Sequence, residues 1–542
     1  MATVGLSNVR ERMEATRWAR TAKAAHAEEN NKWLVSLAVM FGALMGAIDT
    51  SVVNVALPDI MGNVGATQQE ITWIATGYLT SLVILMPLTN WLSTVLGRKR
   101  VYIISLIVFT AASFMCGTSH TLSELILWRV VQGLGAGTLQ PLAQAIFREA
   151  FPLSEQGMAM ALFGFVVMSG PAIGPTLGGW ITDNFSWPWI FFINIPIGVI
   201  GYFAALRYLK DPPNMKGGSK DKVDFSGILL MGVGLATLQI VLEEGETLDW
   251  TSSNLICVCT AVSAVTLIGF VWRELTFSKP AVDLRILKSV PFTAGSIMGG
   301  ILGIGLFAGL FLLPQYMQLM LGFNATQAGL ALMPRSLVMM MMMPVAGRLF
   351  NVLGPRPMIA SGLTIVGFSQ WMMASFTLQT SADQILVPQV IQGFGFALTF
   401  VSLSTTALAW LDRSKLTSGA GLYNLIRQIG GSFGTALVVT VLDRRMDLAR
   451  ANLVRHASPH NPAFGPRFMG LSAHFISHGY PPDLARKTAL TMIDRTVQGQ
   501  ATMIAYDYIF WGIGVLFFAC LPLAWLLKAP PGMLSKGRKA NA

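Results

Sequence analysis

The chain alternates long apolar runs with short polar segments over most of its length. Fourteen runs are long enough to cross a bilayer as helices, because a hydrocarbon core of about 30 Å needs about 20 helical residues. The predicted spans are 34–57, 72–95, 101–117, 122–147, 157–182, 188–207, 225–243, 254–272, 293–314, 327–347, 357–378, 386–410, 418–442 and 504–527. The pattern predicts an all-α polytopic membrane protein with 14 transmembrane helices.

Composition agrees with this prediction. Of the 542 residues, 53% are hydrophobic and only 12% are charged, whereas soluble domains carry about 25% charged residues. Mean hydropathy is +0.56. The 4 cysteines all lie in apolar runs and form no CxxC pair, which excludes a disulfide framework and a cysteine metal site.

The distribution of Lys and Arg orients the chain. With the N-terminus inside, 27 of the 38 basic residues fall on the cytoplasmic side and none in the six short outer loops. Three lie within spans, and 8 lie in a long outer loop at 443–503. Cytoplasmic loops are enriched in Lys and Arg, and long loops translocate regardless of charge. The net charge of +11 therefore requires no nucleic-acid partner, and both termini are expected in the cytoplasm.

Two segments recur at nearly the same distance. Leu92-Ser-Thr-Val-Leu-Gly97 resembles Leu349-Phe-Asn-Val-Leu-Gly354 at an offset of 257 residues, and Gln132-Gly-Leu-Gly135 resembles Gln392-Gly-Phe-Gly395 at an offset of 260. Transporters are often built from such repeats, with the substrate site at the repeat interface. The predicted organisation is a cytoplasmic tail (1–32), a six-helix bundle (33–207), a cytoplasmic linker with two extra helices (208–290), a second six-helix bundle that includes the long loop (291–527), and a cytoplasmic tail (528–542). The first tail could also form a short amphipathic surface helix.

Four motifs occur in order along the N-terminal half: Asp49 to Pro58 in span one, Leu92 to Arg100 after span two, Trp128 to Gly135 in span four, and Gly170 to Gly179 in span five. Together they resemble the major facilitator superfamily, in its 14-span drug:proton antiporter (DHA2) branch of the EmrB/QacA type. The resemblance implies a major facilitator fold and proton-driven export of lipophilic drugs or toxic small molecules by alternating access.

The resemblance also implies roles for particular residues. Gly170, Pro171, Gly174, Pro175 and Gly178 match the gating motif of antiporters, and Gly97, Arg98, Lys99 and Arg100 match the cytoplasmic loop motif. This loop departs from the family pattern, because Asn90 and Thr94 replace the usual Gly and Asp. The three basic residues could contact helix C-termini or anionic lipid, or simply act as positive-inside anchors.

Four charged residues stand out within the spans: Asp49, Arg129, Arg335 and Arg427. A charge at mid-bilayer costs at least about 2.5–3.5 kcal/mol, so such residues are functional candidates. Asp49 and Arg129 are both expected about 10–12 Å below the outer surface, where the family fold brings their helices together. We expect them to pair and to carry proton coupling, with Asp49 charged beside Arg129 and neutral when protonated. The alternative is a static ion pair that fixes helix packing.

Arg335 and Arg427 leave an excess of positive charge within the spans, which favours a cavity for anionic or weakly acidic lipophiles. Competing interpretations are that Arg335 snorkels outward and that Arg427 pairs with backbone carbonyls. The substrate-cavity candidates are Asn54, Gln132, Arg335, Met339 and Arg427. Met339 belongs to a run of five methionines, of which at most two can face a cavity.

Small residues and the long loop complete the pattern. Gly170, Gly174 and Gly178 recur every four residues, so they share one helix face that allows close helix contact. Two amphipathic stretches, near 466–478 and 482–497, suggest a docking cap in the long loop. The resemblance implies a periplasmic membrane-fusion adaptor, an outer-membrane channel and a bacterial inner membrane. The loop histidines His456, His460, His474 and His478 are spaced four residues apart within each pair, which fits a helix. Pro459 and Pro462 interrupt the first pair, so a metal site is not favoured.

Several function classes lack their motifs. The sequence contains no G-x-x-x-x-G-K-[ST], no H-E-x-x-H and no G-x-S-x-G, so neither an ATP motor nor a hydrolase is indicated. We expect no enzyme activity, no cofactor and no metal, with the proton gradient as the energy source. The alternatives are a symporter or facilitator of a small solute, or a membrane-embedded sensor or channel.

Overall fold

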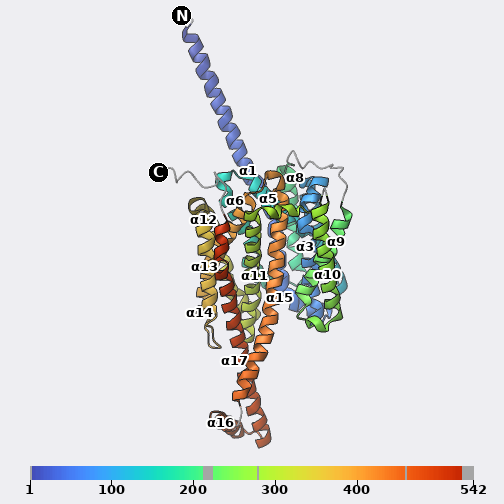
Figure 1. Ribbon diagram of the computed structural model, residues 1–542, viewed down its shortest axis with the longest axis vertical. Coiled ribbons are helices and arrows are strands. Elements are labelled where there is room, and N and C mark those ends of the chain that lie inside the picture. Colours follow the sequence, from blue (N-terminus) through green and yellow to red (C-terminus); the bar gives the residue numbers. More distant parts are fainter. Residues whose placement is uncertain (1–2, 212–223, 278–279, 458–460, 528–542) are drawn as a thin grey trace.

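The computed structural model describes residues 3–211, 224–277, 280–457 and 461–527, and this part of the chain is helical throughout, without strands (Figure 1). The predicted linker at 212–223 and the C-terminal tail at 528–542 lie outside the described residues. The long helices are α1 (Thr3–Val64), α3 (Trp73–Leu96), α4 (Arg98–Gly117), α5 (Leu122–Ala150), α6 (Gln156–Asn184), α8 (Asn194–Tyr208), α9 (Phe225–Glu244), α10 (Asn254–Thr276), α11 (Val290–Leu319), α12 (Ala325–Leu353), α13 (Pro355–Met373), α14 (Ala382–Ala409), α15 (Leu416–His456) and α17 (Pro482–Ala519).

Twelve helical segments of the described chain are long and apolar enough to cross a membrane. The two predicted spans beyond these twelve, 122–147 and 357–378, correspond to α5 and α13. Both helices pack among the others, α5 against α3 and α4 and α13 against α14 and α17. The helices agree with the predicted pattern, while the count of fourteen crossings stays a prediction.

The two halves repeat the same helix pairings, which confirms the predicted duplication. α1 packs on α6 as α11 packs on α15, and α5 lies against α3 and α4 as α14 lies against α12 and α13. The repeated glycines show why the motif recurs. A Cβ on Gly133 would lie 2.3 Å from the Tyr78 carbonyl oxygen, and one on Gly393 would lie 2.6 Å from that of Arg335. Only glycine allows this backbone contact in either half.

The halves meet through α6 with α12 and through α15 with α3 and α5. Contacts are tight at the end where α1 enters the bundle. There the Arg148 guanidinium of α5 donates to the Thr405 carbonyl of α14 across the interface at 3.1 Å, whereas the Lys32–Glu155 ion pair at 3.0 Å joins two segments on the side of the first half. A Cβ on Gly157 would lie 2.6 Å from the Gly347 carbonyl oxygen. The two halves are therefore closed against each other at the end that the charge pattern assigns to the cytoplasm.

The two extra helices, central in the sequence, lie on one flank of the bundle (Figure 1). α9 packs against α3 and α15, one helix from each half. The buried carboxylate of Glu244 accepts hydrogen bonds from Thr76 at 2.8 Å and Thr72 at 3.2 Å, both from the α3 side. On the other side, Gln239 donates to Ser432 of α15 at 2.7 Å. α9 thus links both halves near its outer end.

The loop after α9 adds a further link to α15. The indole N–H of Trp250 donates to Glu246 at 2.5 Å and to Thr440 at 3.0 Å, and the Thr440 hydroxyl donates to the same Glu246 carboxylate at 2.6 Å. Desolvation raises the pKa of Glu246, but these hydrogen bonds outweigh it and leave the pKa below its ordinary value. Glu246 is therefore held as a carboxylate at this junction.

The predicted long loop at 443–503 is mostly helical, which corrects the expected span limits. α15 continues to His456 and α17 begins at Pro482, so both helices extend well beyond the bundle. The short helix α16 (Phe464–Ser477) packs on α17 at the tip of this protrusion (Figure 1). The charged residues of 443–503 interrupt the apolar pattern, but they do not break the helix, because most of them are Arg or Lys, which are good helix formers.

The N-terminal segment also differs from the expected tail with a short surface helix. α1 starts at Thr3 and runs without interruption to Val64, so its first part projects away from the bundle (Figure 1). The segment 1–32 contains no proline, and its only glycine is Gly5. Helix propensity alone therefore does not end the helix at the point where the apolar pattern ends.

Candidate transport site

The predicted contact between Asp49 of α1 and Arg129 of α5 is present. The Arg129 Nη1 lies 2.5 Å from Asp49 Oδ2, and the two side chains are 0% and 1% exposed. The second carboxylate oxygen accepts from Gln132 at 2.7 Å and from Asn194 at 3.1 Å. Arg129 also donates to Gln132 Oε1 at 2.8 Å. The carboxylate is thus held by three side chains from two helices, and its role in proton coupling stays a prediction.

Neighbouring helices fix the geometry of this pair. The Arg129 guanidinium carbon lies 4.1 Å from the centre of the Tyr78 ring, and its Nε donates to the Ile74 carbonyl at 3.4 Å. Asn194 also donates to Ser113 at 3.1 Å, which ties α8 to α4. This ring contact and the hydrogen bonds of Nε and Nη1 offset part of the cost of burying the guanidinium.

The predicted glycine face brings α6 onto the helix that carries Asp49. A Cβ on Gly170 would lie 2.2 Å from the Ala47 carbonyl oxygen, and one on Gly174 would lie 2.5 Å from Ser51. The same contact occurs in the second half, where a Cβ on Gly430 would lie 2.5 Å from the Gly300 carbonyl oxygen. Close glycine packing of this kind is therefore a property of both halves and is not specific to the motif in α6.

Arg335 occupies in α12 the place that Tyr78 has in α3, at the repeat offset of 257 residues. Its side chain is 3% exposed, so it does not snorkel outward. Its Nη1 donates to Gln392 Oε1 at 3.4 Å, and Gln392 is the repeat counterpart of Gln132. No described carboxylate lies within ion-pair distance of Arg335. In each half a buried guanidinium donates to the repeat-related glutamine, Gln132 or Gln392, but only in the first half does a described carboxylate pair with that guanidinium.

Arg427 of α15 lies at the interface between the halves. It donates to Gln140 of α5 at 3.3 Å and to Asn424 at 2.9 Å, and side-chain oxygens rather than backbone carbonyls hold it. Asn424 in turn donates to Gln144 of α5 at 2.6 Å. The guanidinium carbon lies 5.5 Å from the Phe400 ring centre. This polar cluster is buried and contains no described acid.

The remaining cavity candidates do not join these clusters. Asn54 is exposed and lies outside both polar clusters. Met339 is buried with its backbone beside Gly393 of α14, and Met341 is 65% exposed. Met340 and Met343 contact the opposite half, since the Ser169 hydroxyl lies 3.4 Å from the Met340 sulfur and a Cβ on Gly164 would lie 2.8 Å from the Met343 sulfur. The methionine run therefore serves mainly as packing.

The cytoplasmic loop motif forms three contacts at the C-terminal ends of neighbouring helices, which is one of its predicted roles. Arg98 pairs with Glu149 in the last turn of α5 at 2.7 Å. Lys99 Nζ donates to the Leu206 carbonyl in the last turn of α8 at 2.6 Å, and the Lys99 backbone N–H donates to Asp211 at 2.7 Å. The motif thus joins α4 to two helix C-termini, where positive charge is favoured.

Residues 39–435 match the sequence model of the Major Facilitator Superfamily, which is more than half of the chain. The chain belongs to the Major Facilitator Superfamily. It is 33% identical over 512 residues to the multidrug export protein EmrB of Escherichia coli, covering 94% of this chain and 98% of that protein. It is 32% identical over 497 residues to the fatty acid resistance protein FarB of Neisseria gonorrhoeae, covering 92% and 96%.

Solved structures agree on the fold. The human organic anion transporter MFSD10 superposes with a TM-score of 0.58 at 14% identity, covering 90% of this chain and 99% of that one. The proton:xylose symporter XylE superposes with a TM-score of 0.59 at 13% identity, covering 92% and 96%. The predicted major facilitator fold and the resemblance to EmrB-type transporters are confirmed, and the chain is a multi-pass membrane protein of this superfamily.

Sequence reasoning missed most of the neutral polar partners in this major facilitator. Asn194, Gln140, Gln144 and Asn424 are buried or partly buried and hold the charged side chains in place. Their signal was available, since Gln and Asn are costly inside apolar spans and tend to hydrogen-bond across helices. A search limited to charged residues does not find these amide side chains.

Proposed function

We propose that this major facilitator exports lipophilic drugs or toxic small molecules across a bacterial inner membrane in exchange for protons. The observation that carries the proposal is the fully buried carboxylate of Asp49 with its Arg129 partner. A carboxylate can take up and release one proton, and burial and ion pairing act on its charge in opposite directions. A site of this kind can couple a proton to a conformational change. Multidrug export by the relative EmrB, as its name states, supports this function.

The proton cycle follows from the contacts around Asp49. When the carboxylate is charged, it accepts hydrogen bonds from Arg129, Gln132 and Asn194, which tie α1 to α5 and α8. A proton entering from the periplasm neutralises it and weakens these contacts, so α1 can move relative to α5. Release of the proton to the cytoplasm restores the charged, closed network. Two conformations that differ in this way are the requirement for alternating access.

For the substrate, the buried guanidinium groups favour anionic or weakly acidic lipophiles. Arg335 and Arg427 are both buried and find only amide oxygens among the described side chains. A ligand carboxylate would supply the missing charge, and a charge-assisted hydrogen bond is stronger than the amide contact it replaces. Arg427 touches both halves, so a ligand there would contact both. The name of the relative FarB, a fatty acid resistance protein, agrees with such a substrate.

Proteoliposomes with an imposed pH gradient test this proposal. We expect gradient-driven transport of a lipophilic weak acid and much less transport of a lipophilic cationic dye. Arg427→Gln should reduce acid transport by roughly tenfold to a hundredfold, since hydrogen bonds to charged groups contribute about 1.5–3 kcal/mol. The same substitution should leave dye transport unchanged.

Protein-free liposomes correct for passive redistribution of the acid. Arg413→Gln, at an exposed position, is the matched control. Clear preference for the dye would contradict the anionic substrate, and transport indifferent to the gradient would indicate a facilitator.

We also propose that the protrusion formed by α15, α16 and α17 docks a periplasmic membrane-fusion adaptor, which connects the exporter to an outer-membrane channel. The protrusion extends beyond the bundle on the side opposite to the start of α1 (Figure 1). It exposes large apolar side chains, including Met469 at 70% and Ile476 at 46%. Exposed apolar groups outside a membrane mark surfaces for protein partners.

Two acidic substitutions separate docking from transport. Met469→Glu with Ile476→Glu should leave export in proteoliposomes unchanged, because these side chains lie far from the polar clusters, but should abolish drug resistance in cells. Ser477→Glu with Thr491→Glu adds the same charge at exposed polar positions and should affect neither. Full resistance in the first double variant would contradict a docking role for this surface.

A further inference from the structure

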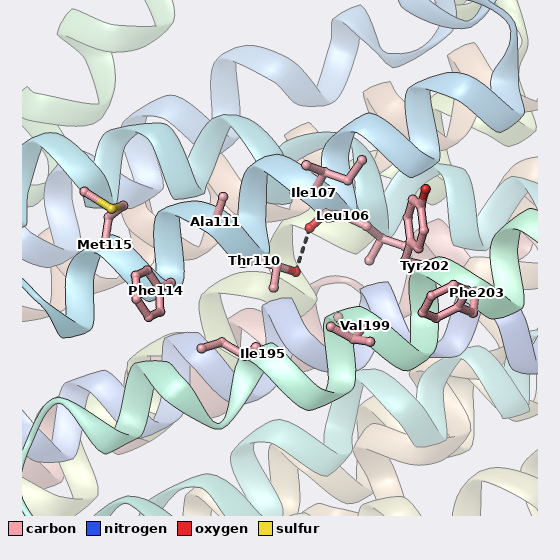
Figure 2. A pocket seen from close by; sticks show the side chains of 11 residues that line it. Leu106, Ile107, Thr110, Ala111, Phe114, Met115, Ile195, Val199, Tyr202 and Phe203 are labelled. Atoms are coloured by element: carbon pink, nitrogen blue, oxygen red, sulfur yellow. Dashed lines mark hydrogen bonds between the residues drawn. The ribbon is translucent and has the colours of Figure 1, made fainter.

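A groove runs between α4 and α8 on the membrane-facing side of the N-terminal half. It encloses about 560 Å³, and Figure 2 shows the side chains of its walls. α4 contributes Ile107, Ala111 and Phe114, and α8 contributes Val199 and Phe203. These residues are exposed, while the opposite sides of both helices pack on α1 and α5. The groove is therefore a separate site from the polar clusters and faces the lipid.

The lining of the groove is apolar apart from two hydroxyl groups. The Thr110 hydroxyl donates to the Leu106 carbonyl at 2.7 Å, so its hydrogen bond is made within its own helix (Figure 2). Tyr202 lies near the end of the groove where α8 ends. A ligand in the groove thus meets hydrocarbon along most of its length, which suits an acyl chain.

Basic side chains lie beyond the predicted cytoplasmic end of the groove, six residues before Leu106 on α4 and four residues after Phe203 on α8. Lys99 brings the start of α4 to the end of α8 through its hydrogen bonds to Leu206 and Asp211. Arg100 and Arg207 flank this junction, are exposed, and have no described carboxylate within ion-pair distance. Asp211 is the acidic group at this junction, and Lys99 and Lys210 neighbour it, so the local charge is positive.

Helix register places the two arginines on the groove. Arg100, Ile107, Ala111 and Phe114 are spaced at seven, four and three residues, so they share one face of α4. Arg207 stands one turn beyond Phe203 and two turns beyond Val199 on α8. From Ile195 to Arg207 the helix rises about 18 Å, close to the roughly 15 Å of hydrocarbon in one leaflet. The groove and its basic end match one acyl chain and its headgroup.

We propose that this groove binds an anionic phospholipid of the cytoplasmic leaflet, with its acyl chain between α4 and α8 and its phosphate between Arg100 and Arg207. The apolar walls alone would accept any phospholipid. The two guanidinium groups can pair with the phosphate of any phospholipid. Selection for net negative charge comes from their combined positive charge, because the choline cation of a zwitterionic lipid is repelled by it. The site does not depend on proton coupling or on the exported substrate.

Lipid titration of the purified full-length protein in neutral detergent tests the site. Phosphatidylglycerol and phosphatidylcholine with identical acyl chains are compared by native mass spectrometry and by the midpoint of thermal unfolding. We expect the wild type to prefer phosphatidylglycerol. Arg100→Gln with Arg207→Gln should weaken phosphatidylglycerol binding by roughly thirtyfold, as expected for two basic side chains near a membrane surface, and should weaken phosphatidylcholine binding much less.

Matched variants separate this site from general effects. Arg348→Gln with Arg413→Gln removes the same charge at exposed positions of the same side and should keep the preference. Ala111→Trp fills the groove and should weaken binding of both lipids, whereas Ala264→Trp on the exposed face of α10 should not. An equal response of the wild type to both lipids, or an unchanged preference in the Arg100/Arg207 variant, would overturn the proposal. So would dihexanoyl phosphatidylglycerol binding as tightly as the long-chain lipid, because the groove would then contribute nothing.

Discussion

Asp49→Asn is expected to abolish accumulation of substrate against its gradient, while the protein still reaches the membrane. Asn keeps the shape of the side chain but cannot exchange a proton, so Arg129, Gln132 and Asn194 lose a carboxylate whose charge can change. A charge moving through 100 mV is worth about 2.3 kcal/mol, so one proton per cycle supports roughly a 40-fold substrate gradient. The variant should support none. The measurement is the steady-state substrate ratio across proteoliposomes under an imposed gradient.

Two further variants make this result specific. Asp59→Asn changes an exposed carboxylate on the same helix and should keep the gradient. Removing one member of a buried ion pair costs about 3–5 kcal/mol because a charge is left unpaired, so Asp49→Asn is expected to be less stable than the wild type even though it reaches the membrane. Asp49→Asn with Arg129→Gln removes both charges and should fold with wild-type thermal stability within about 1–2 kcal/mol, again without accumulation. Coupled export in this double variant would refute proton coupling at Asp49.

The sequence predicted the parts of the molecule that repeat a simple physical rule. Apolar length placed the helices, because every backbone group inside a membrane must be satisfied within its own helix. The predicted contact of Asp49 with Arg129 is present, because a helix rises by a constant amount per residue and equal distances from the helix ends bring the two residues to the same level. The glycine spacing in α6 predicted one contact face, and the structure brings that face onto α1. None of these inferences required knowledge of the loops.

The parts that were missed depend on contacts between distant segments. No periodicity shows that Arg427 of α15 meets Gln140 of α5, because the two residues belong to different halves. The place of α9 on the flank follows from its hydrogen bonds to Thr76 and Ser432, which sequence spacing does not reveal. The helical protrusion was missed because hydropathy detects burial in lipid, whereas α15 and α17 continue as helices into water.

Gly170→Ala is expected to destabilise the protein and to stop export, whereas Gly179→Ala on the same helix is expected to be tolerated. A Cβ at position 170 would lie 2.2 Å from the Ala47 carbonyl oxygen, so α1 and α6 would have to separate. Overpacking of this kind costs about 1–3 kcal/mol. At position 179 the nearest atom is the Val55 Cγ1 at 3.9 Å, an ordinary contact. Ala at position 179 should therefore raise the stability of the protein by about 0.5–1 kcal/mol, because Ala has a higher helix propensity than Gly.

The same methyl group therefore has opposite expected effects two turns apart, and thermal unfolding of the purified variants measures both. Gly430→Ala extends the comparison to the second half, where the added Cβ would lie 2.5 Å from the Gly300 carbonyl oxygen. Close packing of α1 on α6 has a specific role in gating only if the two variants differ in export. Gly170→Ala should then lose more export than Gly430→Ala when both lose the same stability, because α1 carries Asp49 and α11 carries no such group.

Equal loss of export in both variants would mean that the glycines act through general helix packing. Wild-type stability and export in Gly170→Ala would show that α1 and α6 can separate at no cost, which contradicts the packing argument itself.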